Sequence, residues 1–145
     1  MKKFAKKNNK GFSLVELIVV VLIMAIIAVA LAPQVMKWVN NARISADVQS
    51  YDSLVSNVQL AYTTKSDVYT NCSGETYTVT LSATGTTVTG GTDTKRKTLT
   101  DEMTALVGDW AGVKAKVKKA TYTFTVIDGK VTKTAAPDGD SVANN

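Results

Sequence analysis

Few residues of this 145-residue chain have the chemistry of a catalytic or metal site. The chain has no histidine, which removes the commonest general base and excludes Ser-His-Asp, Cys-His and the usual zinc sites. Cys72 is the only cysteine, so it cannot form an intrachain disulfide. It lies between Asn71 and Ser73 in a stretch that we predict to be a polar loop, where a free thiol is favoured over an intersubunit disulfide. We therefore predict no catalytic residue, no metal and no cofactor, and no enzymatic activity.

Three weaker patterns involve polar or charged residues. Asp138-Gly139-Asp140-Ser141, together with Asp128, could supply oxygens to calcium, but it lacks the ligand spacing of an EF-hand loop, so a solvated tail is favoured. Asn71-Cys72-Ser73 matches a glycosylation-acceptor pattern, which is weak support for modification. Several basic residues could contact DNA phosphates, but no aromatic residue is interleaved for base stacking, so nucleic-acid binding is predicted to be weak or absent. These are Lys95, Arg96, Lys97, Lys114, Lys116, Lys118 and Lys119.

The net charge of +5 comes from the first ten residues, which contain five lysines. From Gly11 onward, 12 basic residues balance 12 acidic ones. The bulk charge therefore gives no argument for an anionic partner if the N-terminus is a processing segment.

The segment from Phe12 to Ala32 contains 21 residues and one charge, Glu16. A helix of this length reaches about 30 Å at ~1.5 Å per residue, which is enough to span a bilayer. The preceding lysines predict that the N-terminus lies on the cytoplasmic side. The alternative is a secretory signal peptide cleaved near Ala30 or Ala32, although this apolar run exceeds the typical length of a signal core.

Glu16 is the unusual residue of this segment. A carboxylate in a membrane-spanning helix is costly and needs a partner, yet the segment contains no cation. Snorkelling of the preceding lysines compensates only in part. A positive charge created by processing is the other possibility.

The run from Lys10 to Glu16, KGFSLVE, follows a basic leader and precedes an apolar stretch, and in this it resembles the type IV prepilin signature. The resemblance covers roughly residues 1–60, and it includes Pro33, where these helices commonly have a proline. It implies cleavage between Gly11 and Phe12 by a prepilin peptidase, N-methylation of Phe12, and assembly by a pilus ATPase and an inner-membrane platform. The new ammonium group of Phe12 would then be the cation that Glu16 lacks, contributed across a subunit contact.

The helix is predicted to continue beyond Pro33, which kinks or locally unwinds it. Residues 34 to about 64 contain no glycine or proline and carry two apolar stripes. The later stripe is predicted to pack on the subunit's own β region, and the earlier one to face other subunits. The later stripe is Ile44, Val48, Tyr51, Val55, Val58 and Tyr62; the earlier one is Val35, Trp38, Val39, Ala42 and Ala46.

Beyond Lys65 the apolar spacing changes to a period of two, which is typical of strands. Strands are predicted at 76–81, 121–126 and 131–134, with Asp128-Gly129 forming a hairpin turn. A short helix is predicted from Asp101 to Val107, capped by Thr100 and stopped at Gly108. Residues 113–119 fit either an edge strand or a frayed helix. Residues 83–97 and 135–145 are predicted to be loop and tail.

Together these features predict an α+β, pilin-like fold, in which a long N-terminal helix packs on a small antiparallel sheet. The predicted division is a cleaved leader at 1–11, a transmembrane and filament-core helix at 12–33, an amphipathic helix at 34–64 and a β region at 65–145. The predicted function is that of a structural type IV pilus subunit, held in the cytoplasmic membrane as precursor and exposed on the cell surface in the filament. The alternatives are a pseudopilin of a type II secretion or competence system and a single-span membrane-anchored binding protein.

Overall fold

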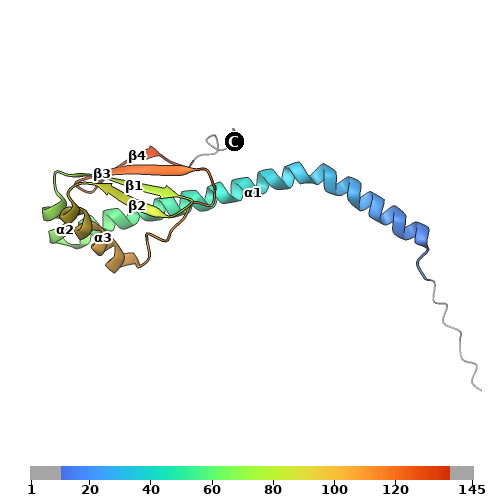
Figure 1. The fold of residues 1–145 in the computed structure, drawn as a ribbon, viewed down its shortest axis with the longest axis horizontal. Helices are drawn as coiled ribbons and strands as arrows, with labels where there is room; N and C mark the ends of the chain where they lie inside the picture. Colours follow the sequence, from blue (N-terminus) through green and yellow to red (C-terminus); the bar gives the residue numbers. More distant parts are fainter. Residues whose placement is uncertain (1–10, 138–145) are drawn as a thin grey trace, which may run out of the picture. The chain divides into compact units, whose positions relative to one another are not determined.

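The computed structural model describes residues 11–137. Its longest element is α1, a helix of 51 residues from Leu14 to Thr64 (Figure 1). Pro33 lies inside this helix and lacks the N–H that would bond to the carbonyl of Val29, yet α1 continues through it without interruption. Of the two effects expected at Pro33, a kink or local unwinding, the structure therefore rules out the unwinding, and the kink stays a prediction. The helix ends at Thr64, as its sequence predicts.

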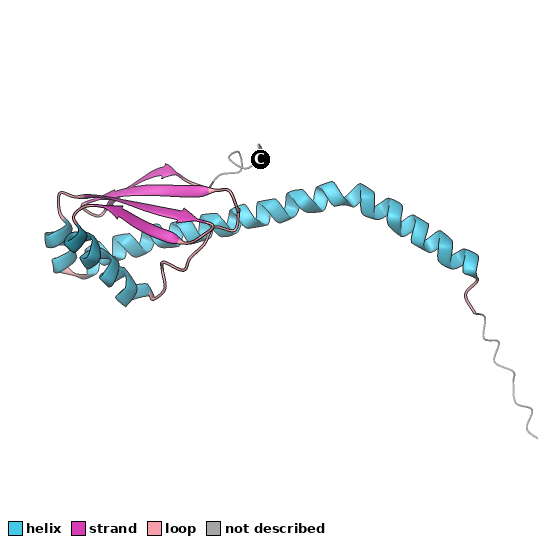
Figure 2. Cartoon of the chain, viewed as in Figure 1, coloured by secondary structure: helices cyan, strands magenta, loops and turns pink. Residues whose placement is uncertain are grey.

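The chain contains two compact units, Met1–Trp38 and Val39–Asn145. We call the described part of the second, residues 39–137, the head unit. Its four strands form one antiparallel sheet in the order β2-β1-β3-β4. They are β1 Thr76–Ser82, β2 Thr86–Gly90, β3 Thr121–Ile127 and β4 Lys130–Ala135. The α+β fold predicted from the sequence is confirmed (Figure 2).

The head part of α1 runs along one face of the sheet (Figure 1). In β1 and β3 every second residue is buried, which turns one apolar face toward the helix. Tyr51 of α1 joins the two layers, because its hydroxyl donates to the carbonyl of Thr123 at 3.0 Å. Its ring also meets that of Phe124 edge-on, with centroids 5.4 Å apart.

The stripe predicted to face the sheet is largely confirmed. Ile44, Tyr51, Val58 and Tyr62 are buried. Val48 is exposed, which corrects its assignment to the core. The buried face of α1 is rotated slightly from the predicted stripe. It therefore also contains Asp47, Leu54 and Ala61. The earlier stripe has no buried residue: Val35, Trp38, Val39 and Ala42 are exposed, and Ala46 is half-buried.

Two short helices complete the head unit, α2 at Ser66–Cys72 and α3 at Asp93–Val107. The predicted helix at 101–107 ends correctly, because Gly108 adopts a φ of 79° and its N–H caps the carbonyl of Thr104 at 2.9 Å. It starts eight residues too late, and Thr100 lies inside α3 instead of capping it. The apolar periodicity becomes visible only at Leu99, since the first turns of α3 bury nothing.

Residues 83–97 do not form the predicted loop, because they contain β2 and the first turns of α3. β2 pairs with β1 from Thr86 to Gly90, although its sequence TTVTG shows little apolar alternation. Backbone pairing with β1 forms this strand, and side-chain burial contributes little. Residues 113–119 form neither of the two predicted elements, but an irregular segment with turns. Ala135 ends β4, and the rest of the predicted tail beyond Pro137 lies outside the described residues.

The predicted hairpin at Asp128-Gly129 is confirmed. These residues have φ values of 50° and 77°, the left-handed pair that a type I′ turn requires. Asp128 also accepts a hydrogen bond from the backbone N–H of Gly74 at 2.7 Å. The turn is thereby tied to the segment that precedes β1.

Candidate functional site

The N-terminal part of α1 exposes apolar side chains on all sides. Its most apolar stretch has no residue buried in the structure, and it is long and apolar enough to cross a membrane. Phe12, two residues before the start of the helix, is 90% exposed. Contiguous apolar surface of this extent requires lipid or protein to cover it. The exposed residues beyond Phe12 include Leu14, Val15, Leu17, Ile18, Val19, Val20, Val21, Leu22, Ile23, Met24, Ile26, Ile27, Val29, Leu31, Val35, Met36, Trp38 and Val39.

Glu16 lies in the first turn of this helix. Its Oε2 accepts a hydrogen bond from the backbone N–H of Ser13 at 2.9 Å, which satisfies one of the free donors at the helix start. Within residues 11–137, Glu16 forms no ion pair. The cationic partner that we expect for this carboxylate therefore stays a prediction.

Gly11 precedes the helix in an open position. A Cβ placed on it would meet no atom within 4 Å, and its backbone is not in the left-handed region. The described fold therefore does not itself require glycine here. Any requirement for Gly11 would come from a protein that acts on this peptide bond, and the processing roles of Gly11 and Phe12 stay predictions.

The candidate calcium ligands identified in the sequence are Asp128 and the run from Asp138 to Ser141. Across residues 11–137 no three carboxylate, cysteine or histidine side chains gather in a way that could hold a metal ion. Asp128, one of the predicted calcium ligands, is engaged with Gly74. The others, Asp138, Gly139, Asp140 and Ser141, lie outside the described residues.

Cys72 is not in a polar loop, which corrects the sequence-based placement. It is the last residue of α2 and is fully buried, and its Sγ donates to the carbonyl of Lys95 at 3.3 Å. Burial raises the pKa of the thiol. An intersubunit disulfide is incompatible with this burial.

The basic residues proposed for DNA separate into two groups. Lys95, Arg96 and Lys97 all form ion pairs, with Glu75, Asp93 and Asp101 respectively. The four lysines between 114 and 119 are exposed and form no ion pair with any residue of the described range. Three of the seven basic residues are therefore paired within the head unit, and four are not.

Sequence reasoning missed Asp47, a buried carboxylate on α1. Its two oxygens accept hydrogen bonds from the backbone N–H groups of Lys116 and Val117, the latter at 3.1 Å. It sits in the middle of the predicted core stripe, three residues after Ile44 and four before Tyr51. Its position within this stripe is the sequence signal that predicts a buried, hydrogen-bonded carboxylate.

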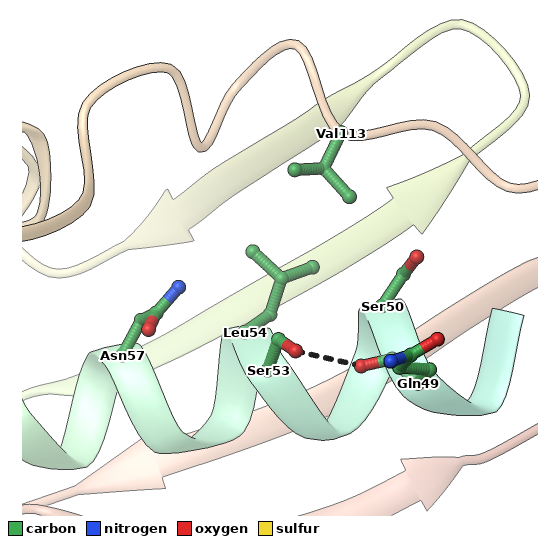
Figure 3. Close-up of a pocket in the computed structure, with 6 residues that line it drawn as sticks. All are labelled: Gln49, Ser50, Ser53, Leu54, Asn57 and Val113. Atoms are coloured by element: carbon green, nitrogen blue, oxygen red, sulfur yellow. Dashed lines mark hydrogen bonds between the residues drawn. The ribbon is translucent and has the colours of Figure 1, made fainter. Parts of the chain in front are cut away.

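One open cavity of about 260 Å³ lies between α1 and Val113 (Figure 3). Its lining contains amides, hydroxyls and two apolar side chains, and none of these is an acid, a base or a strong nucleophile. The hydroxyl of Ser53 donates to the backbone carbonyl of Gln49 at 2.8 Å. The lining residues are Gln49, Ser50, Ser53, Leu54, Asn57 and Val113. This cavity offers no catalytic chemistry.

Comparison with known proteins gives one match. Residues 6–32 match the family model described as the prokaryotic N-terminal methylation motif. No curated protein and no solved structure matches the chain. The matched residues contain the Gly11-Phe12 junction, Glu16 and most of the exposed apolar helix.

The motif and the fold together define a class. The match is the class III signal peptide of type IV pilin-like proteins, and a long apolar helix followed by a small antiparallel sheet is the pilin-like arrangement. The chain therefore carries the methylation motif and class III signal of type IV pilin-like proteins, followed by a helix long and apolar enough to cross a membrane and by a sheet in a pilin-like arrangement. The motif implies processing by a prepilin peptidase, a membrane-anchored precursor and a structural role.

Proposed function

We propose that this protein is a structural subunit of an extracellular type IV pilus. The leader, residues 1–11, is removed after Gly11, and the new N-terminus at Phe12 is methylated. Residues 12–33 hold the precursor in the cytoplasmic membrane with the head unit outside, and they then form the filament core. Residues 34–64 connect this core to the β region at 65–145. The partners are other copies of the chain, the prepilin peptidase and methylase, the assembly ATPase and its inner-membrane platform.

The observation that carries this proposal is the exposed apolar helix behind a methylation motif. The described residues from Phe12 to Val39 bury no side chain in the structure. In the precursor, lipid can cover the first part of this surface. Outside the membrane only other protein can cover it, and a bundle of identical helices does so by symmetry.

Glu16 favours helix-to-helix assembly over a lone membrane span. A carboxylate in apolar surroundings is costly unless it is paired, and the described part of the chain supplies no cation to it. The α-ammonium of Phe12 is created by leader cleavage, and it belongs to the same end of the helix. A neighbouring copy can therefore present this charge to Glu16, which makes the pair an assembly contact. Pro33 is assigned to the same filament-core helix.

A pseudopilin would carry the same signal and helix, so these features favour it equally. A single-span binding protein is less well supported, since it would leave Glu16 without a cationic partner. The two filament classes differ in what the assembled filament does, and surface filaments visible by electron microscopy in cells that express this chain separate them.

The proposal is tested by substituting Glu16. Glu16→Val and Glu16→Ala should leave cleavage and insertion intact, because removing a charge makes the span cheaper to insert. Surface filament yield should fall steeply, since each added subunit would bury an unpaired ammonium at a cost of ~3 to 5 kcal/mol. Glu16→Gln keeps the shape without the charge and should fail in the same way.

The measurement compares total cellular subunit with sheared surface filaments. Normal filament yield from Glu16→Val would contradict the charge pair. Loss of the processed subunit itself would place the role of Glu16 in maturation or stability instead of assembly.

A further inference from the structure

The segment between α3 and β3 combines an anchored backbone with outward lysines. Val113, Ala115 and Val117 are buried or half-buried. Lys114, Lys116, Lys118 and Lys119 are all exposed. This alternation turns the apolar side chains toward the head unit and the charges away from it. We call these four side chains the lysine platform.

Hydrogen bonds fix the backbone of this segment at several points. The Oγ1 of Thr86 donates to the carbonyl of Val113 at 2.8 Å, and the N–H of Ala115 donates to the carbonyl of Ser82 at 2.9 Å. The N–H groups of Lys116 and Val117 donate to the buried carboxylate of Asp47. An irregular segment with these contacts presents its lysines from a defined backbone instead of a loose loop.

The platform is not neutralised by the described part of the protein. The five ion pairs there use other cations, namely Lys65, Lys95, Arg96, Lys97 and Lys133. The carboxylate closest to the platform backbone, Asp47, directs both oxygens to amides and is shielded from solvent. Arg43 lies one helical turn before Asp47, is exposed and likewise has no ion pair among residues 11–137.

The place of the platform in the chain indicates its partner. Asp47, which holds it, follows the end of the apolar run at Ala32 by 15 residues, and Lys37 and Arg43 lie between them. The described part of α1 contains no acidic residue between Glu16 and Asp47. Clusters of lysine and arginine close to a membrane span are attracted to anionic lipid headgroups, and this attraction weakens with salt.

We propose that the lysine platform docks the head unit on the anionic lipid surface of the membrane that anchors the precursor. This inference rests on the membrane-anchored precursor of the proposed function, and not on filament assembly. The lysine ammonium groups contact lipid phosphates, and the contact is released when the subunit leaves the bilayer. Docking would hold the head unit in one orientation before assembly.

The test uses the full chain reconstituted in vesicles and measures how fast each lysine is acylated. One vesicle preparation contains phosphatidylglycerol mixed with phosphatidylcholine, and the other contains phosphatidylcholine alone. Mass spectrometry of the peptides gives a rate for each lysine. Lys130 is the matched control, because it is exposed on β4 and has no ion pair within the described residues.

In anionic vesicles at low salt, acylation of the four platform lysines should slow by about fivefold, and high salt should restore it. Lys130 should react at the same rate in both preparations. Flotation of the vesicles first shows whether the chain is bound to the lipid. If it is, equal acylation rates of the platform lysines in the two preparations would overturn docking. If soluble polyphosphate slows acylation of the platform lysines in detergent and anionic vesicles do not, the platform binds a soluble polyanion, and docking on lipid is overturned. A chain that floats with neither vesicle would contradict the membrane anchor as well.

Discussion

The buried carboxylate of Asp47 and the backbone N–H of Val117 are joined by a hydrogen bond of 3.1 Å that links α1 to the segment before β3. The two residues are 70 positions apart in the sequence. The second oxygen of Asp47 accepts from the neighbouring N–H of Lys116. This one side chain therefore satisfies two backbone donors of a segment that forms neither a helix nor a strand.

Removal of this carboxylate should destabilise the head unit. Asp47→Ala leaves two donors without an acceptor, and we expect a loss of about 2 to 4 kcal/mol in the free energy of unfolding. Chemical denaturation measures it. Asp52→Ala is the matched control on the same helix: its ion pair with Lys133 is about half exposed, so its loss should cost about 0 to 1 kcal/mol. Equal effects of both substitutions would contradict the anchoring role of Asp47.

Separation from the apolar helix should leave a folded head. A fragment starting at Val35 lacks the most apolar residues and Glu16, but it keeps the buried face of α1 from Ile44 to Tyr62. We expect a soluble monomer with mixed helix and strand content and one cooperative unfolding transition. Sedimentation, circular dichroism and denaturation check this. Aggregation or gradual unfolding would show that this face of α1 does not belong to the core of the head unit.

Tyr62 should make the stability of this fragment fall at alkaline pH. Burial raises the pKa of its hydroxyl above the ordinary value of 10.0, and the nearby Cys72 and Asp128 add to the shift. The unfolded chain therefore loses this proton at a lower pH than the folded one. Stability is unaffected below the ordinary pKa and decreases as the pH rises through it.

Tyr62→Phe should make this alkaline decline shallower and leave stability near neutral pH unchanged or slightly higher. Part of the decline should persist, because burial also raises the pKa values of Tyr77, Tyr51 and Cys72. The Tyr62 hydroxyl is buried and has no hydrogen-bond partner among residues 11–137, so its removal leaves no group unsatisfied. Tyr69→Phe is the matched control, because Tyr69 is 56% exposed. Denaturation across the pH range compares the three proteins. An unchanged alkaline decline in Tyr62→Phe would assign it to other groups.

The sequence predicts the elements whose periodicity is strong. β1 and β3 alternate apolar and hydroxyl side chains, and the Asp128-Gly129 pair fits only a narrow set of turns, so all three are confirmed. The long helix is equally clear, because residues 34–64 contain no glycine or proline.

The missed features depend on contacts between distant residues. β2 exists through its pairing with β1, and the segment at 113–119 is held by Asp47, Ser82 and Thr86. Cys72 has polar neighbours in the sequence, which favours a loop, while its burial in the core and its hydrogen bond to Lys95 of α3 depend on tertiary contacts. For the same reason, the ion pairs that separate Lys95, Arg96 and Lys97 from the lysine platform could not be read from spacing.

Gly11→Val should test the processing site without disturbing the fold. The position is open in the structure, so the substitution introduces no clash within the described chain. We expect the unprocessed precursor to accumulate, because a bulky residue at the cleaved bond would not fit the peptidase. Immunoblotting of membranes detects the size difference of the leader. Normal processing of Gly11→Val would contradict the assignment of the cleavage site.

The central claim is that a chain processed after Gly11 forms a filament, and the most direct measurement is the N-terminal mass of the subunit in sheared surface filaments. We predict a filament subunit that begins at N-methylated Phe12. Phe12 is exposed at the start of α1, where a peptidase and a neighbouring copy can both reach it. A mature chain beginning at Leu31 or Pro33, found in the medium and not in filaments, would contradict the claim and establish a secreted protein.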